Sequence, residues 1–238
     1  MVIRDSASLI ILDLEEKDNP KILMGKRHNA HNFLPNCYVF PGGKLDRADF
    51  STPYNSHLHP IDYQKLLQKV PKKKQNSNRP QALGIAALRE CYEETGIFIG
   101  SQRDSESFKS LAAGNTFIKA FVEQGLLPDL SKLTFFCRAI TPPISPKRYD
   151  TRFFITQRSQ INHISPSSSD ELEDVHWVSI NDAKMLKTAY ITMTIINLLK
   201  ENINRKIVFD RTQPSPLFMM RYGKAFTEYL NQEDMAKA

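Results

Sequence analysis

The sequence predicts an α/β fold in which helices flank a mixed central sheet. Three observations support this prediction: a pair of strands joined by a short turn near the start, one strong helix signal in the first half, and several strand segments after it. With 238 residues, of which 41% are hydrophobic, the chain is long enough to bury a sizeable core. We therefore expect a single domain, 1–238, that carries an insertion.

The first two strands are predicted to form a β-hairpin. Residues 8–14 read as a buried strand and residues 21–27 as its antiparallel partner, with the turn at Asp18-Asn19-Pro20. A third short strand, 37–40, ends at Pro41-Gly42-Gly43, where the two glycines permit close approaches that a side chain would forbid. This loop can bring backbone beside a ligand.

The composition changes over residues 50–79, which are rich in Asn, Ser, His, Lys and Pro. We interpret this segment as an insertion that arches over or beside the cleft and contains one short helix at 62–70. A strong helix signal follows, beginning near Pro80 and ending at Gly96, the natural C-terminal stop.

The remaining segments alternate between helix and strand patterns and end in a helical extension over about 190–238. In chain order we expect one or two helices in 104–125, strands at 133–140, 152–156 and 175–178, a helix opening at Asn181, and a further helix at 192–202.

Composition excludes several classes of protein. The three cysteines, Cys37, Cys91 and Cys137, are too few and too far apart for a disulfide framework or a zinc motif. No segment resembles a secretory signal or a membrane span, so we expect a cytoplasmic protein. The net charge of +6 suits anionic ligands, but the basic run 72–74 is interpreted as a solvated loop, and nucleic acid is an unlikely partner.

Three carboxylates share one face of the predicted helix. Glu90, Glu93 and Glu94 occupy positions i, i+3 and i+4. An acidic surface stripe is the alternative interpretation, because exposed helix faces are commonly charged. Carboxylates beside a strand-ending glycine loop also form the oxygen-rich environment that Mg²⁺ prefers.

These residues resemble the box of the Nudix hydrolases, G-x5-E-x7-R-E-U-x-E-E-x-G-U, in which U is aliphatic. Gly43 takes the first glycine position and Asp49 stands where the first glutamate belongs. Cys91 replaces an aliphatic residue, a mild change because free cysteine behaves as a small hydrophobe. The second half of the box is filled in order by Arg89, Glu90, Cys91, Glu93, Glu94, Gly96 and Ile97.

The two halves of the box are separated by 39 residues, between Asp49 and Arg89, where the family has 7. Loop-closure entropy makes this lengthening cost only about 1.5 kcal/mol. Such an interrupted box is similar to that of peroxisomal coenzyme A diphosphatases and their bacterial relatives. The resemblance extends to residues 40–46, 140–154 and Glu171, and it implies the Nudix α/β/α sandwich with an insertion inside the box.

The resemblance also implies an activity: Nudix enzymes hydrolyse a nucleoside diphosphate linked to another moiety, with Mg²⁺ or Mn²⁺ bound. Glu90, Glu93 and Glu94 would hold the metal, and Arg89 would pair with Glu93. For the general base we favour Glu171. One of the metal-facing glutamates remains an alternative, as do Glu173 and Asp174, which follow Glu171 in an acidic segment. The substrate would contact Gly42, Gly43, Arg148 and Arg152, with an ion pair to Asp150 as the alternative for Arg148.

The substrate remains open. Coenzyme A or an acyl derivative leads, although the coenzyme A signature expects Gly and Arg where this chain has Asn36 and Asn32. Dinucleoside polyphosphates, ADP-ribose, NADH and capped RNA are alternatives. A binding module that senses a nucleotide without cleaving it is a further alternative, which the three intact helix glutamates disfavour. No membrane partner is expected, and the oligomeric state is open, with a homodimer among the options.

Overall fold

The computed structural model describes residues 2–29, 35–103, 114–166 and 171–231, and its central element is a nine-stranded mixed sheet. The strands of this sheet are β1 (Arg4–Asp13), β2 (Lys21–Arg27), β3 (Tyr38–Val39), β4 (Gly42–Lys44), β8 (Thr134–Ile140), β9 (Tyr149–Gln157), β11 (Leu172–Ser179), β12 (Ser215–Arg221) and β13 (Lys224–Leu230). The main order is β11-β2-β1-β9-β8-β12-β13, with β3 on β2 and β4 on β1. Only the β1–β9 and β8–β12 pairs are parallel.

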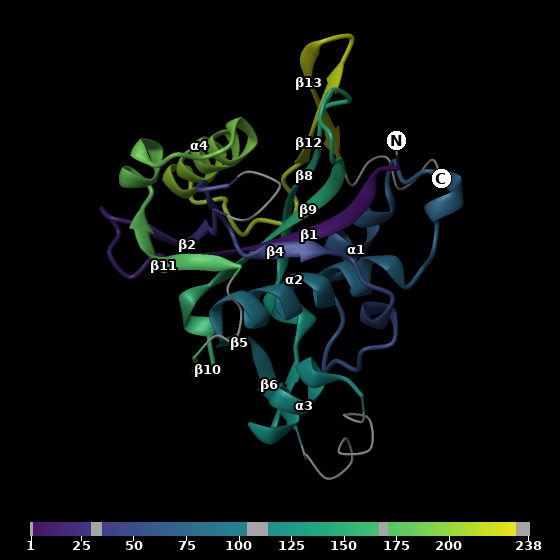
Figure 1. Ribbon diagram of the computed structural model, residues 1–238, viewed down its shortest axis with the longest axis vertical. Coiled ribbons are helices and arrows are strands. Elements are labelled where there is room, and N and C mark those ends of the chain that lie inside the picture. Colours follow the sequence, from purple (N-terminus) through teal and green to yellow (C-terminus); the bar gives the residue numbers. More distant parts are fainter. Residues whose placement is uncertain (1, 30–34, 104–113, 167–170, 232–238) are drawn as a thin grey trace.

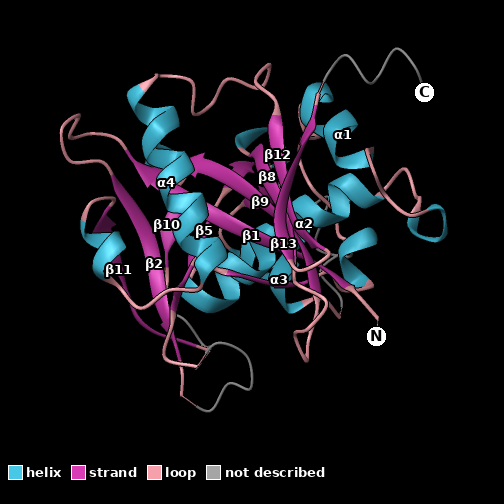
Figure 2. Ribbon diagram, turned by 90° about the horizontal axis from the view of Figure 1, so that it is seen from above, coloured by secondary structure: helices cyan, strands magenta, loops and turns pink. Residues whose placement is uncertain are grey.

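Helices cover both faces of this sheet (Figure 1; Figure 2). The helices of the described residues that run for eight residues or more are α1 (Pro60–Leu67), α2 (Arg79–Thr95), α3 (Thr116–Glu123) and α4 (Tyr190–Asn204). Two small antiparallel sheets lie outside the main one and consist of β5 (Ile97–Phe98) with β10 (His163–Ile164) and β6 (Gly100–Gln102) with β7 (Leu126–Pro128). The arrangement confirms the α/β fold with a mixed central sheet.

Strand β1 explains why the core has two layers. Its side chains alternate between faces, as the period of two in a strand requires. Leu9 and Ile11 enter the cluster that contains the α2 side chains, whereas Ile10 and Leu12 enter the cluster that contains those of α4. Because both faces are covered, the strand reads as a continuous apolar run.

Helix α2 matches the predicted helix over 80–96 within one residue at each end. Pro80 lies in its first turn, where a missing N–H costs nothing. Gly96 ends it in the left-handed region, at φ 71°, and donates its N–H to the carbonyl of Tyr92 at 2.7 Å. The sequence signals at both ends are therefore confirmed.

The edge of β1 opposite β9 is shared by two strands. Strand β2 pairs with its end, Leu12 opposite Ile22, whereas β4 pairs with its beginning, Ser8 opposite Gly42. Between these partners the N–H of Leu9 donates to the carbonyl of Pro41 at 2.9 Å. The glycine loop is therefore fixed against the central strand, next to the helix that packs on that strand.

The insertion packs as part of the core, and the expectation of an arching segment is wrong. Leu58 and Leu66 are 3% and 2% exposed and belong to the same apolar cluster as the buried face of α2. Helix α1 begins two residues earlier than predicted and ends three residues earlier. The polar composition of 50–79 hid these apolar positions.

The predicted helical extension over about 190–238 is wrong beyond α4. Strands β12 and β13 form a hairpin that joins the main sheet beside β8. Tyr222 and Gly223, with φ 52° and 73°, make the two-residue turn. The hairpin signal is a strand-like run on each side of Tyr-Gly, which the helical interpretation overlooked.

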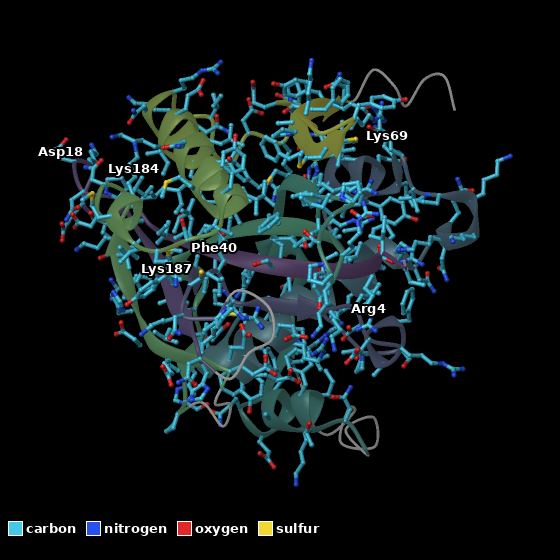
Figure 3. The ribbon with its side chains drawn as sticks, turned by 45° about the horizontal axis from the view of Figure 1, so that its top comes forward. Arg4, Asp18, Phe40, Lys69, Lys184 and Lys187 are labelled. Carbon is cyan, nitrogen blue, oxygen red and sulfur yellow. The ribbon has the colours of Figure 1, made fainter. Side chains whose placement is uncertain are left out.

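Helix α1 holds the chain that leads into this hairpin. The buried ammonium of Lys65 donates to the carbonyls of Arg211 and Gln213, at 2.8 and 2.6 Å, and to the hydroxyl of Ser215 at 3.1 Å. Next along the chain, Lys69 pairs with Glu228 of β13 (Figure 3). The insertion and the C-terminal hairpin therefore form one packed unit.

Replacing Lys65 with alanine should lower the free energy of unfolding by about 3 kcal/mol, because it leaves buried acceptors without their donor. Lys69→Ala is the matched control. The side chain of Lys69 is 41% exposed, so its loss should cost less than about 1 kcal/mol. Urea unfolding of the two variants measures both values, and equal small effects would contradict the structural role of Lys65.

The later elements agree with the predictions where the structure describes them. Strand β8 begins one residue after the predicted segment 133–140 does, β9 and β11 contain the predicted segments 152–156 and 175–178, and α4 contains the predicted helix at 192–202. Of the helical segment 104–125, residues 104–113 lie outside the described residues, and α3 occupies the rest. The helix expected to open at Asn181 is a single 3-10 turn, Asp182–Met185. No described helix has the length and apolar character needed to cross a bilayer.

Candidate active site

The glycine loop meets helix α2 at Glu90 and Glu94. A Cβ added to Gly43 would lie 2.3 Å from the carboxyl carbon of Glu90, so only glycine leaves room for that carboxylate. The N–H of Gly42 donates to Oε2 of Glu94 at 2.8 Å. The loop and the helix, separated by an insertion in sequence, therefore form one site.

Arg89 closes the interrupted box. Its Nε and Nη2 donate to the two carboxylate oxygens of Asp49, at 2.8 and 3.1 Å, and its Nη1 donates to Glu90 and Glu93, at 2.9 and 3.0 Å. Its Nη2 also donates to the carbonyl of Lys44 at 3.0 Å. The predicted Arg89–Glu93 pair is present. Asp49, which replaces the first glutamate of the box, binds Arg89 through both of its carboxylate oxygens.

Burial and mutual repulsion change the acidity of the helix carboxylates. Burial, opposed by Arg89, raises the pKa of Glu90 to about 7, and the charges of Glu93 and Glu171 add to the increase. Burial also raises the pKa of Glu94 well above its usual range, helped by the charges of Glu90 and Glu171. The pKa of Glu93 is raised by burial as well. The group therefore concentrates negative charge in a poorly solvated position.

Glu171 joins this group from the position just before β11. Its carbonyl accepts the N–H of His28 at 3.2 Å, and the next residue, Leu172, begins β11 opposite Arg27. Its charge raises the pKa of both Glu90 and Glu94, so its carboxylate lies within electrostatic range of the helix pair. Residues 167–170, which precede it, lie outside the described residues.

The rival carboxylates have other partners. Glu173 pairs with Nε2 of His28 at 3.2 Å. Asp174 accepts the hydroxyl of Tyr38 at 2.5 Å and lies 3.2 Å from Nδ1 of His176, within a bulge of β11. Neither contributes to the raised pKa of Glu90 or Glu94 among the principal causes. Of the three carboxylates, Glu171 therefore has the strongest effect on the pKa of Glu90 and Glu94.

Comparison with known proteins identifies the family. The NUDT19 Nudix domain matches residues 12–192, more than half of the chain. The chain belongs to the Nudix hydrolase family. The match begins within β1 and ends within α4, so it includes both halves of the interrupted Nudix box and Glu171.

Individual relatives are distant. The acyl-coenzyme A diphosphatase NUDT19 of Xenopus laevis is 25% identical over 205 residues, covering 65% of this chain and 50% of that protein. Putative nudix hydrolase 7 of Caenorhabditis elegans is 25% identical over 183 residues, covering 74% and 51%. The chain thus spans about half the length of these curated relatives. The crystal structure of a NUDIX hydrolase from Alicyclobacillus acidocaldarius superposes with a TM-score of 0.63 at 23% identity, covering 88% of this chain and 96% of that one, and it confirms the Nudix fold.

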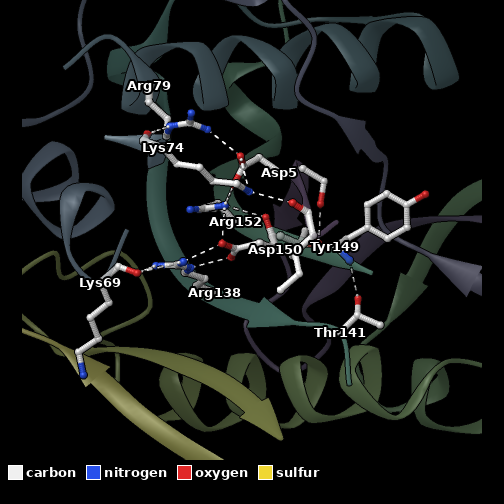
Figure 4. A network of polar contacts seen from close by, with 12 residues as sticks. Asp5, Lys69, Lys74, Arg79, Arg138, Thr141, Tyr149, Asp150 and Arg152 are labelled. Carbon is white, nitrogen blue, oxygen red and sulfur yellow. Dashed lines mark hydrogen bonds and ion pairs between the residues drawn. The ribbon is translucent and has the colours of Figure 1, made fainter. Parts of the chain in front are cut away.

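The prediction that Arg152 contacts substrate is wrong. Its side chain is 0% exposed and lies inside a network of charged residues near the beginning of β1 and β9 (Figure 4). Its Nη1 donates to Asp5 and to the carbonyl of Asp150, both at 2.7 Å, and Arg138 makes a bidentate pair with Asp150. The alternation of β9 points Arg152 inward, which the sequence pattern around it did not reveal.

The structure does not bring Arg148 to the Nudix carboxylates either. Its Nε donates to the carbonyl of Thr141 at 3.0 Å, across the loop that joins β8 to β9. Asp150, its expected ion-pair partner, is bound by Arg138 instead. Contact between Arg148 and substrate therefore stays a prediction.

Sequence reasoning missed one basic residue of the site. Arg27, at the end of β2, is close enough to Glu94 for its charge to lower the pKa of that carboxyl, against the stronger effect of burial. In the sequence, Arg27 is recognisable only as the last residue of a strand. Its place near Glu94 follows from the pairing of β2 with β11, the strand that begins after Glu171.

The donor set fits a hard divalent cation. In the described parts of the chain, no three carboxylate, imidazole or thiol groups already surround a common point; Arg89 binds Glu90 and Glu93, and Gly42 binds Glu94. The oxygen-only chemistry and the mutual repulsion of Glu90, Glu94 and Glu171 nevertheless suit an ion such as Mg²⁺, which would offset that repulsion.

Replacing Gly43 with alanine should displace the Glu90 carboxylate, because the new methyl group would overlap it. We expect kcat/KM to fall by about 10²-fold, the usual cost of misplacing a catalytic group by about 1 Å. Steady-state hydrolysis measures this effect. Gly84→Ala, on the same helix as Glu90, is the control, since its Cβ would meet only the ends of the flexible side chains of Leu130, Leu133 and Leu58. Equal activity of the Gly43 variant and the native protein would contradict the close packing described above.

Proposed function

We propose that this protein is a divalent-metal-dependent pyrophosphohydrolase that cleaves the diphosphate bridge of a nucleoside diphosphate linked to another moiety. The observation that carries the proposal is the closed Nudix box. Arg89 binds Asp49 from one half of the box and Glu90 and Glu93 from the other half, while Gly43 packs on Glu90. An acidic surface stripe would need none of these contacts.

The residues of the site have separable roles. Glu90, Glu93 and Glu94 would hold Mg²⁺ or Mn²⁺. When bound, the ion would neutralise diphosphate charge and acidify the attacking water. Arg89 fixes the rotamers of Glu90 and Glu93 through its hydrogen bonds. The backbone N–H of Gly42 fixes Glu94, and the loop at Gly42 and Gly43 would contact the substrate.

Glu171 is the proposed general base. Its backbone is fixed to β2 through His28, and its carboxylate lies within electrostatic range of Glu90 and Glu94. A carboxylate at this place can accept the proton of the attacking water while the helix glutamates remain bound to the ion. Of the three carboxylates, Glu171 is the one whose charge is a main cause of the raised pKa of Glu90 and Glu94, which supports this assignment over its rivals.

Coenzyme A or acyl-coenzyme A is the proposed substrate class. The name of the Xenopus laevis relative, an acyl-coenzyme A diphosphatase, supports it, as does the net charge of +6, which suits a substrate with several phosphates. ADP-ribose, NADH, dinucleoside polyphosphates and capped RNA remain the competing substrates. The proposed metal-binding residues and general base are the same for each of these substrates.

A panel of these diphosphates, incubated with Mg²⁺ or Mn²⁺ in ¹⁸O water, tests the proposal. We expect metal-dependent turnover, with mass spectrometry placing one ¹⁸O on the attacked phosphorus. The fastest member of the panel identifies the leaving moiety. Tight binding without turnover across the whole panel would favour a nucleotide sensor and contradict the hydrolase.

A further inference from the structure

Strand β13 forms one end of the main sheet. It pairs with β12 through seven consecutive residue pairs without a bulge, and within the described residues no strand lies on its other side. Edge strands present N–H and C=O groups to which another strand can add, and proteins commonly protect them with charged side chains, proline or a bulge. Strand β13, with the sequence KAFTEYL, has no proline or bulge, and its two charged residues, Lys224 and Glu228, are of opposite sign.

The hairpin also exposes aromatic side chains. Tyr222, Phe226 and Tyr229 are 101%, 43% and 55% exposed, and they are three of the eight large hydrophobic side chains that are exposed among the described residues. The hairpin projects beyond the body of the molecule at the top of Figure 1. Exposed apolar groups gathered along a sheet edge are typical of an interaction surface.

We propose that β13 is a self-association surface, at which a second copy of this chain adds its own β13 in antiparallel orientation and continues the sheet. The strand is complementary to itself about Phe226. In the register centred there, Lys224 lies opposite Glu228 of the second copy, and Phe226 lies opposite its own equivalent. Because side chains alternate along a strand, these three residues share one face, where cross-strand neighbours interact.

The contacts within one copy favour this register. Lys224 lies opposite Arg221 in the hairpin, which places two positive charges side by side. Arg221 instead pairs with Glu228 at 3.0 Å, and its guanidinium lies 5.0 Å from the centre of the Phe226 ring. Glu228 and Phe226 are thus already ordered. A second copy would supply the carboxylate opposite Lys224.

Other registers lose this complementarity. Centring the pair on Thr227 would place Glu228 opposite Phe226 and Lys224 opposite Leu230. The contact is a single strand edge, smaller than a standard protein interface, so we expect a reversible dimer with a dissociation constant of about 10 to 100 µM. The association is independent of the proposed hydrolase site, which lies beside β1 and α2.

Sedimentation velocity of the full chain, from about 1 to about 200 µM, tests the proposal. The native protein should shift from monomer toward dimer over this range. K224E would place a glutamate opposite Glu228, and E228K would place a lysine opposite Lys224. Each should raise the dissociation constant by about tenfold or more. Tyr190→Ser is the control, because Tyr190 is 81% exposed on α4 and should leave association unchanged.

Mixing the two charge variants provides the sharper test. An equimolar mixture of K224E and E228K should associate more tightly than either variant alone, since both cross-strand pairs regain opposite charges. E228K also loses the contacts of Glu228 with Lys69 and Arg221, so its melting temperature is recorded. If E228K does not fold, K224E alone, which keeps those contacts, decides the test through its dissociation constant. A monomer at every concentration, or a mixture that behaves like its separate components, would overturn the proposal.

Discussion

Glu94→Gln should lower kcat by about 10³-fold and leave the melting temperature unchanged or raised. A bound metal supplies several kcal/mol of charge stabilisation in the transition state, and each 1.36 kcal/mol changes a rate tenfold. Glutamine removes the negative charge that holds the ion. Its amide oxygen can still accept the N–H of Gly42, the bond that Glu94 makes at 2.8 Å. Hydrolysis rates at saturating Mg²⁺ measure the loss.

The stability part of this prediction follows from the raised pKa of Glu94. A carboxyl with a raised pKa in the folded state stabilises the protein below its unfolded pKa, and that stability is lost as the pH rises through the folded value. At pH 8 without metal, burying the neutral glutamine amide therefore costs less free energy than burying the glutamate, which must either stay charged or take up a proton. Glu123→Gln, on the exposed side of α3, is the matched control and should change neither quantity. Normal turnover of Glu94→Gln at saturating metal would exclude Glu94 as a ligand.

Glu171→Gln should lower kcat by about 10² to 10⁴-fold, the usual contribution of a general base. KM should change little, because the proposed role of Glu171 is to accept a proton from water. Metal affinity, measured by calorimetry, should change less than in Glu94→Gln. The basis for this expectation is the electrostatic coupling of Glu171 to Glu90 and Glu94.

Glu173→Gln tests whether the loss of any carboxylate close to Glu171 in sequence would lower kcat in the same way. Glu173 lies two residues away but pairs with His28 at 3.2 Å, so its amide variant should retain kcat within about threefold, as expected for a half-exposed ion pair worth less than about 1 kcal/mol. A larger loss in Glu173→Gln than in Glu171→Gln would reverse the assignment of the base. If both variants were as active as the native enzyme, one of the helix glutamates would be assigned as the general base.

Local patterns predicted most secondary elements because their signals lie within a few residues. The buried run of β1, the turn before β2 and the start and stop of α2 at Pro80 and Gly96 each need only neighbouring side chains to be read. The glutamate spacing on α2 likewise follows from helix geometry alone. These features place three carboxylates on one helix face without any contact between distant residues.

Burial that depends on contacts between residues far apart in sequence could not be predicted from local patterns. Leu58 and Leu66 sit among polar residues, and only packing on α2 reveals them as core. Arg152 and Arg148 looked equivalent in sequence, yet β9 turns Arg152 inward toward Asp5. The C-terminal hairpin was missed because its strand pattern becomes decisive only when β12 pairs with β8.

The sequence by itself determined the α/β class, the Nudix box and the identity of its helix carboxylates, because a motif of that kind is a local property of the chain. Only the tertiary structure decided that Asp49 returns to Arg89 across 39 residues, that the charge of Glu171 acts on Glu90, and that Arg152 is buried. Those outcomes depend on strand pairing and on which face of a strand is covered, and contacts between residues far apart in sequence set both.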